Sequence, residues 1–290
     1  LRCLVGSEMC IRDSSYLFGT YHGTYDILYQ YTDSIPELHQ AFNACSQFAG
    51  ESETTSKPTP AQVGAAIKLP KDTTYADLLN KEDFHFLDSI VRQSLKSPLN
   101  KMYIKPNFLA LILGEIEKGK KLVDTGYSQS RIDSMKSQVM DIALEKKAKE
   151  KGLTIVGLED IFDAFVSEKS NLKKEADELI SDLREDDEIS PLSFVNTLSD
   201  VYRTQNMKSL IDFEVKVDSI FRTSPKLTEI GKRIREDLLK RRNLNWMNKI
   251  PELMKAQPTF IAVGVRHLPG KDGLIALLLE KGYQVEPIGL

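Results

Sequence analysis

The sequence predicts an α/β fold in which a central mixed sheet takes strands from both ends of the chain and carries a large helical insertion in the middle. Apolar, strand-like runs lie near both ends, at 15–22 and 258–264. Between them, helical periodicity dominates from about 61 to 150 and from 161 to 250. Strands that bracket a helical middle fit one sheet with helical insertions better than they fit two independent domains.

Composition places the chain among ordinary globular proteins. Its 290 residues are enough to bury a full core, and a hydrophobic share of 41% with a charged share of 28% is typical of soluble domains. The formal net charge of −3 gives no sign of non-specific binding to nucleic acid. No apolar run approaches the ~18 residues that span a bilayer. We therefore expect a soluble chain with no nucleic-acid partner and no transmembrane segment.

The segment 1–14 differs from the rest of the chain. It opens without Met, shows no readable period and resembles translated sequencing-adapter text. We expect 1–14 to be a non-native artefact and 15–290 to form a single domain; the alternative for 1–14 is a short native strand or arm. Cys3 and Cys10 fall in this segment, which leaves Cys45 without a pairing pattern for a disulfide or a zinc site. Cys45 is therefore expected to be a small buried hydrophobe.

In the first half of the chain, helix and turn signals divide the sequence into short elements. Ser34 suits a helix N-cap and Pro36 a first helical turn, whereas the Thr, Ser and Pro residues of 54–60 indicate a loop. Pro106 likewise suits the start of a helix. The predicted elements are a strand at 15–22, a helix at 35–44, a short strand at 47–52, a loop at 54–60 and helices from 61 to about 120.

In the second half, glycines and periodicity set the boundaries. An amphipathic helix over 131–151 stops at Gly152, and another helix over 274–281 stops at Gly282. The charged stretch 168–187 is expected to be the solvated face of a helix. The remaining predicted elements are a buried strand at 153–159, helices from 161 to about 250, a strand at 258–264 and a last strand at 283–288.

Two copies of a Gly-x-x-His pattern are the main candidates for a functional site. Each follows a strand-like run, one ending at His22 and the other at His267, in a chain with 4 His. An α/β fold presents ligands at the carboxyl edge of its sheet, so the two imidazoles can meet there if both strands share one sheet. Two further predicted strands end on carboxylates, Glu51 and Glu159. The pattern therefore predicts either a metal site or an acid/base pair at this edge.

The donor types suit a divalent metal. Two neutral imidazoles with one or two carboxylates suit Zn, Mn, Co or Fe(II), and they leave positions open for water. A metal-bound water loses its proton near neutral pH and becomes a nucleophile for hydrolysis, while a nearby carboxylate can take up that proton. His39 and His85, by contrast, lie on predicted helices without a partner pattern and are expected to be structural.

Two other segments carry hydrogen-bond donors suited to a functional site. Arg242 and Asn243, with Trp246 on the same predicted helix, form either a solvated basic face or a guanidinium aimed at the site. The turn 268–273 leads into a helix, and it is either a capped turn or a source of N–H groups for an oxyanion or a phosphate. The chain lacks a Gly-x-Ser-x-Gly elbow, a Walker loop, a Rossmann glycine fingerprint and a His-Glu-x-x-His helix. Hydride transfer and nucleotide-driven chemistry are therefore disfavoured.

Taken in order, these residues resemble the TraB/GumN family, which includes the Tiki metalloproteases. The resemblance covers about residues 15–288 and implies an α/β fold whose active centre combines the two Gly-x-x-His motifs with an acidic residue. It rests on seven pieces of the sequence: 16–22, Gly50-Glu51, Lys105-Pro106, Asp141, Gly157-Leu158-Glu159, Arg242-Asn243 with Trp246, and 260–273.

The resemblance also implies an activity and a cofactor. In Tiki-like members it implies divalent-metal-dependent hydrolysis of peptides, with Mn or Co favoured and Zn or Fe as further possibilities. It makes His22 and His267 metal ligands and Glu51 their acidic partner. Glu159 is then a second acidic group, as a ligand or as a general base.

The resemblance further implies that Arg242 and Asn243 orient a peptide or protein substrate or stabilise the oxyanion. It implies a bacterial periplasmic or cell-envelope location, with a cytoplasmic one left open because any signal would have been lost with the true start. The chain departs from the family pattern at two positions. Arg266 replaces a small residue before the second His, where it can narrow the site or bind an acidic group of the substrate. Asp160 replaces the Thr that often follows the residue equivalent to Glu159.

Two other functions stay open beside a metal-dependent peptidase. One is a metal- or haem-binding protein without hydrolytic activity. The other is a catalytically idle interaction protein of the kind linked to pheromone or conjugation control. Metal content and peptide cleavage are the two properties that separate these functions from each other.

Overall fold

The structure is a computed structural model that places the chain in two compact units. The first unit combines Leu1–Ser56, Ser134–Ala164 and Ile189–Leu290, and the second combines Lys57–Asp133 and Phe165–Glu188. The expectation of a single domain over 15–290 stays a prediction. The residues that the structure describes are 2–4, 15–21, 36–53, 59–124, 126, 128, 130, 139–160, 171–184, 198 and 200–288.

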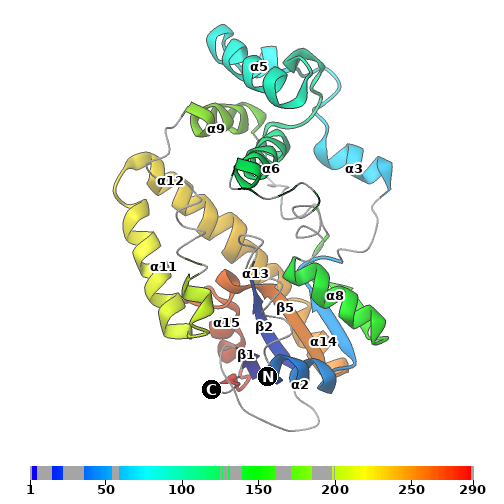
Figure 1. The fold of residues 1–290 in the computed structure, drawn as a ribbon. Coiled ribbons are helices and arrows are strands. Elements are labelled where there is room, and N and C mark those ends of the chain that lie inside the picture. The colour runs from blue at the N-terminus through cyan, green and yellow to red at the C-terminus, as the bar shows by residue number, and fades with distance from the viewer. Residues whose placement is uncertain are drawn as a thin grey trace. The chain divides into compact units, whose positions relative to one another are not determined.

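The described strands of the first unit form one sheet in which every pairing is parallel (Figure 1). The α/β class predicted from the sequence is confirmed, but the expectation of a mixed sheet is wrong. The physical reason is that from β2 onward consecutive strands are connected through helices, and such crossovers return the chain in a parallel direction. The order across the sheet is β4 (Thr154–Gly157), β3 (Gln47–Gly50), β5 (Thr259–Gly264), β2 (Tyr16–Thr20), β1 (Arg2–Leu4) and β6 (Glu286–Pro287).

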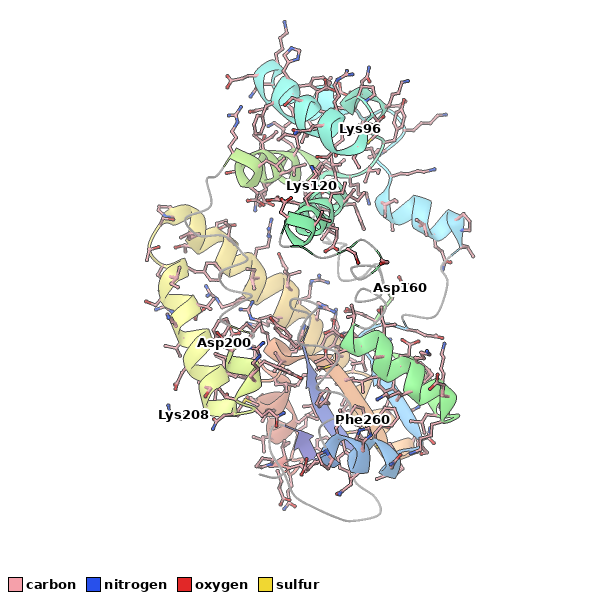
Figure 2. The ribbon with its side chains drawn as sticks, viewed as in Figure 1. Lys96, Lys120, Asp160, Asp200, Lys208 and Phe260 are labelled. Carbon is pink, nitrogen blue, oxygen red and sulfur yellow. The ribbon has the colours of Figure 1, made fainter. Side chains whose placement is uncertain are left out.

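The strands predicted at 15–22 and 258–264 are confirmed where they are described, as β2 and β5, and they are buried on both faces. Because successive side chains of a strand point to opposite faces, Phe260 and Ile261 of β5 enter two different cores. Phe260, labelled in Figure 2, stacks on Phe48 of β3 with ring centroids 6.2 Å apart. On the other face, Ile261 belongs to the same cluster as the fully buried Trp246. The sheet is thus packed on both sides.

The outer strands differ more from their predictions. The run at 153–159 was expected to be buried, yet β4 is an edge strand whose Thr154 is exposed, because its only described neighbour is β3. The last strand is shorter than predicted, with β6 limited to Glu286–Pro287. β1 lies inside 1–14 and pairs with β2 and β6. The expectation that 1–14 is an artefact stays a prediction.

Helices cover both faces of this sheet. On the face of Phe260, α2 (Pro36–Ala44) contributes Phe42, and α8 (Met140–Glu150) contributes Met140 and Leu144. The helix predicted at 35–44 is thereby confirmed for 36–44, while residue 35 and residues 131–138, the first part of the helix predicted over 131–151, lie outside the described residues. The helices associated with the other face are α11 (Met207–Phe221), α12 (Pro225–Arg233), the π-helix η2 (Ile234–Lys240), α13 (Arg241–Trp246), α14 (Ile250–Ala256), the 3-10 turn η3 (Val265–His267) and α15 (Leu274–Glu280).

The second unit is helical and has its own core. Leu87, Val91 and Leu109 are fully buried there and pack in one cluster with Leu179. The charged stretch 168–187 is confirmed as a solvated helix face where it is described, since α9 buries only Ala176, Leu179 and Ile180. The elements are α3 (Pro60–Ile67), α4 (Tyr75–Leu78), α5 (Lys81–Leu95), η1 (Leu99–Lys101), α6 (Pro106–Asp124) and α9 (Leu172–Arg184).

Two smaller predictions concern single features. Cys45 is buried, and burial raises the pKa of its thiol to about 12 against a smaller lowering effect of Lys151. The prediction that Cys45 is a small, buried and unpaired residue is therefore confirmed.

None of the helices in the described ranges combines the length and apolar character that a membrane crossing requires.

Candidate functional site

Two carboxylates lie side by side where two neighbouring strands end. Glu51 directly follows β3, and Glu159 follows β4 after Leu158. The parallel pairing continues past the strand ends, because the N–H of Leu158 donates to Gly50 O at 2.9 Å and that of Glu159 donates to Glu51 O at 2.8 Å. The register of two strands therefore fixes the two carboxylates as neighbours.

Arg242 joins these carboxylates. From α13 its Nε donates to Glu159 Oε1 at 2.8 Å, and its Nη2 donates to Glu51 Oε2 and to Glu159 Oε1. The Arg242 side chain is only 11% exposed. Burial acts to lower the pKa of this guanidinium, but the hydrogen bonds and negative charges of Glu159 and Glu51 outweigh burial and raise it. Of the two interpretations of this helix, the structure supports a guanidinium aimed at the site.

His267 lies against the same guanidinium. Its Nε2 is 3.2 Å from Arg242 Nη1 and 3.9 Å from Glu51 Oε1. Its Nδ1 is 2.7 Å from Asn243 Oδ1, and the ring packs on Trp246 with centroids 4.5 Å apart. His267 is buried, so these neighbours rather than bulk water set its chemistry.

The second Gly-x-x-His motif contributes a backbone hydrogen-bond donor as well as its imidazole. The backbone N–H of Gly264 donates to Glu51 Oε1 at 2.6 Å, so both oxygens of Glu51 have a described donor. Glu159 is held in the same way, because Trp246 Nε1 donates to Glu159 Oε2 at 3.0 Å while Arg242 binds Oε1. The two carboxylates are thus fixed by the strand end and by α13.

Trp246 is a site residue for which no separate role was predicted from the sequence. It is the only tryptophan of the chain and is fully buried. The Arg242 guanidinium lies over its ring, 4.7 Å from the centroid, in cation–π geometry. The signal was present in the sequence, because residues i and i+4 of a helix share a face and Arg242 and Trp246 have that spacing.

The first Gly-x-x-His motif is only partly described. His22 lies outside the described residues, and the description ends at Tyr21. Up to that point the two motifs run in parallel register, with Gly19 opposite Val263 and Thr20 opposite Gly264. Thr20 Oγ1 donates to Asp141 of α8 at 2.8 Å, so this strand end is tied to a helix.

Arg266, which departs from the family pattern, and the turn 268–273, which had two interpretations, both make contacts within the chain. Arg266 forms a bidentate pair with Glu214 of α11, with Nε–Oε1 at 2.6 Å and Nη2–Oε2 at 2.8 Å. Its acidic partner therefore comes from the protein itself. The turn 268–273 folds on itself, because a Cβ at Gly273 would lie 2.2 Å from Pro269 O. The structure favours a packed turn there over an anion site.

The described residues do not by themselves fit a metal centre. Within the described ranges, no group of three or more His, Cys, Asp or Glu is placed to hold a metal ion. Of the three ligands implied by the resemblance, His267 and Glu51 are near each other, while His22 falls outside the description. The positive charge of Arg242 also faces His267 Nε2, which is the atom that would bind a cation. As arranged, Arg242 forms an ion pair with Glu51 and contacts His267 Nε2.

Fold and site together define an α/β protein with a buried imidazole, arginine and carboxylate cluster at the carboxyl edge of a parallel sheet. A sequence model of the TraB/PrgY/gumN family matches residues 11–287 of the chain. The chain therefore belongs to the TraB/PrgY/gumN family, and the resemblance seen in the sequence is confirmed. No curated protein and no solved structure matches the chain.

Proposed function

We propose that the chain is a hydrolase that cleaves peptide bonds at the carboxyl edge of its sheet. One observation carries this proposal: His267, Glu51 and Arg242 come from three different elements of the fold and meet in one buried cluster. A buried charged cluster of this kind is costly unless it is fully paired, and such clusters concentrate at functional sites. The resemblance to Tiki-like members supports peptides as the substrate class.

His267 is the proposed proton acceptor. Its Nε2 is the ring nitrogen that faces the cluster, and an imidazole at this position can take a proton from an attacking water. Glu51 Oε1, 3.9 Å away, then stabilises the imidazolium that forms, and the imidazolium returns the proton to the leaving amine as the C–N bond breaks. Before it can act, Nε2 must exchange its contact with Arg242 Nη1 for the water, a tightening that substrate-free sites commonly require.

Arg242 is the proposed stabiliser of negative charge. A guanidinium has five N–H donors, and the described contacts use four of them: Nε, both Nη2 hydrogens and one Nη1 hydrogen. The second Nη1 hydrogen can donate to the carbonyl oxygen of a substrate as that oxygen gains charge. Glu159 fixes the guanidinium for this task, rather than acting as a free general base.

The finer proposal is a divalent metal, with Mn or Co favoured and Zn or Fe possible. Its ligands would be His22, His267 and Glu51, and the ion would supply an activated water. The donor types support this, but Arg242 must leave His267 Nε2 before a cation can bind there. The steps assigned to His267 and Arg242 are therefore independent of a metal. On the resemblance alone, we also propose a location in the bacterial cell envelope.

Incubation of the full chain with a defined peptide pool, followed by mass spectrometry of the products, tests the proposal. We expect cleavage that stops on adding a chelator and returns with Mn or Co. His22→Ala should abolish the metal-dependent part, whereas His85→Ala, an exposed position on α5 of the second unit, should change nothing. Cleavage that ignores the chelator but needs His267 would reject the metal and keep the hydrolase. No cleavage by a folded chain under any of these conditions would reject both.

A second candidate is a catalytically idle interaction protein. The observation in its favour is that Arg242 already forms ion pairs with both Glu51 and Glu159, as in a purely structural ion-pair network. Under this hypothesis Arg242→Met lowers stability only, and the wild-type chain cleaves no peptide. The peptide-pool experiment separates the two candidates directly.

A further inference from the structure

The amide of Asn243 lies between two backbone carbonyls and the imidazole of His267. Its Nδ2 is 3.1 Å from His267 O and 2.8 Å from Asp272 O. Carbonyl oxygens only accept hydrogen bonds, so both must face the NH₂ group and not the amide oxygen. The reversed amide would place an oxygen against two oxygens. The orientation of Asn243 is therefore fixed by the backbone, and its Oδ1 must face the ring.

This orientation decides which nitrogen of the His267 ring carries the proton. Oδ1 of Asn243 has no hydrogen, so at 2.7 Å the ring Nδ1 must be the donor. A neutral imidazole has a single N–H, which leaves a lone pair on Nε2. The contact on the other side of the ring leads to the same assignment. Arg242 Nη1, 3.2 Å from Nε2, can only donate, so Nε2 must be the acceptor.

We infer that Asn243 is a positioning residue that holds His267 in the tautomer protonated on Nδ1, with the lone pair of Nε2 directed into the cluster. Burial strengthens this control, because Asn243 is 1% exposed and His267 4% exposed, so water does not replace the amide. The same amide ties the ring to the turn that follows β5, through the carbonyls of His267 and Asp272. The chemical use of Nε2 rests on the proposed function, whereas the tautomer does not.

The inference changes the role expected for Asn243. The resemblance implied that it orients substrate or stabilises an oxyanion, which requires an available N–H. Both hydrogens of Nδ2 are taken by backbone carbonyls, so Asn243 acts through His267 and not on the substrate. Residues that orient a reacting imidazole in this way commonly change activity by about 10- to 100-fold when they are replaced.

Nitrogen NMR of the full chain, labelled with ¹⁵N-histidine and kept in chelator, reads the tautomer directly. The signals of His267 are assigned by their loss in His267→Gln. We expect a protonated-type Nδ1 and an unprotonated-type Nε2. A wild-type ring protonated on Nε2 alone would overturn the inference.

Three variants test whether the amide of Asn243, rather than another neighbour of the ring, sets the tautomer of His267. Asn243→Leu removes the acceptor for Nδ1 and is expected to shift the ring toward the Nε2-protonated form. Asn243→Asp keeps an acceptor for Nδ1 and should keep that nitrogen protonated; if the Leu variant fails to fold, the wild-type spectrum decides the inference. Asn245→Leu, an exposed control position on the same helix, should leave the spectrum unchanged. Full retention of the wild-type tautomer in a folded Asn243→Leu would show that Arg242 sets it instead.

Kinetics then link the tautomer to the chemistry. If peptide cleavage is found, Asn243→Leu should lower kcat by about 10- to 100-fold with little change in KM, because the substrate does not touch the amide. A chain with the expected tautomer but no cleavage would overturn the proposed function and leave this inference standing. Cleavage by a chain with the opposite tautomer would overturn this inference and leave the proposed function standing.

Discussion

Replacing Arg242 by Met removes the cation that joins Glu51 and Glu159 and leaves two neighbouring carboxylates facing each other. All three side chains are largely buried, with exposures of 11% for Arg242, 19% for Glu51 and 8% for Glu159. Removing one partner of a buried ion pair costs about 3 to 5 kcal/mol of unfolding free energy. Each carboxylate keeps a described donor, Gly264 N for Glu51 and Trp246 Nε1 for Glu159. We therefore expect the lower end, about 3 kcal/mol, or a fall in Tm of roughly 6 to 12 °C.

The assay is urea unfolding followed by the fluorescence of Trp246, the only tryptophan, whose ring lies 4.7 Å from the guanidinium carbon. This probe reports the cluster itself. The control is Arg241→Met, one position earlier on α13 and only partly buried, which we expect to change stability by less than about 0.5 kcal/mol. Adding Glu51→Gln and Glu159→Gln to Arg242→Met should restore most of the lost stability.

The pH dependence of this loss has a definite sign. Because the pKa of Arg242 is raised above its usual value, its favourable contribution is complete below that usual value and is lost only at still higher pH. The penalty of Arg242→Met should therefore be constant from neutral to moderately alkaline pH. A loss no larger than that of Arg241→Met, or one that changes over this range of pH, would refute this account of the cluster.

The remaining predictions concern neighbouring groups. Glu214→Gln should lower the unfolding free energy by about 1 kcal/mol in urea titrations, because it breaks the partly buried pair with Arg266; an unchanged midpoint would contradict it. Trp246→Phe keeps a ring beside the imidazole but removes the donor to Glu159, and should cost about 1.5 to 3 kcal/mol by circular dichroism melting. Cys45, with its pKa raised to about 12, should resist alkylation at pH 8 in a chain whose other two cysteines are serine. Since the unfolded thiol ionises first, stability should fall as the pH rises from about 9 toward 12.

The sheet edge was predictable because strand ends are local features. The apolar runs ending near Glu51, Glu159 and His267 can be identified one at a time, and a parallel sheet brings their carboxyl ends to one edge. Which run lies at the border of the sheet depends on pairings between distant segments. That is why β4 was expected to be buried and is instead an edge strand.

The contacts among the side chains of the imidazole, arginine and carboxylate cluster could not be predicted from the sequence in the same detail. Arg242 binds Glu159 and Glu51 across separations of 83 and 191 positions, and no local pattern encodes such a pairing. The role of Asn243 depends on two backbone carbonyls supplied by the turn after β5. The π-helix η2, which directly precedes α13, adds a change of helical period that the pattern of apolar residues does not reveal.

The most direct test of the central claim is the ratio of kcat/KM between His267→Gln and the wild-type chain on a cleaved peptide. His267 is the group proposed to take the proton, and general-base catalysis contributes about 10²- to 10⁴-fold. We predict a loss of at least about 100-fold, with the Trp246 fluorescence of a folded cluster retained. A His267→Gln chain that cleaves the peptide within a factor of about 2 of wild type, well outside the range expected for a lost general base, would contradict the claim that this cluster is the reacting centre.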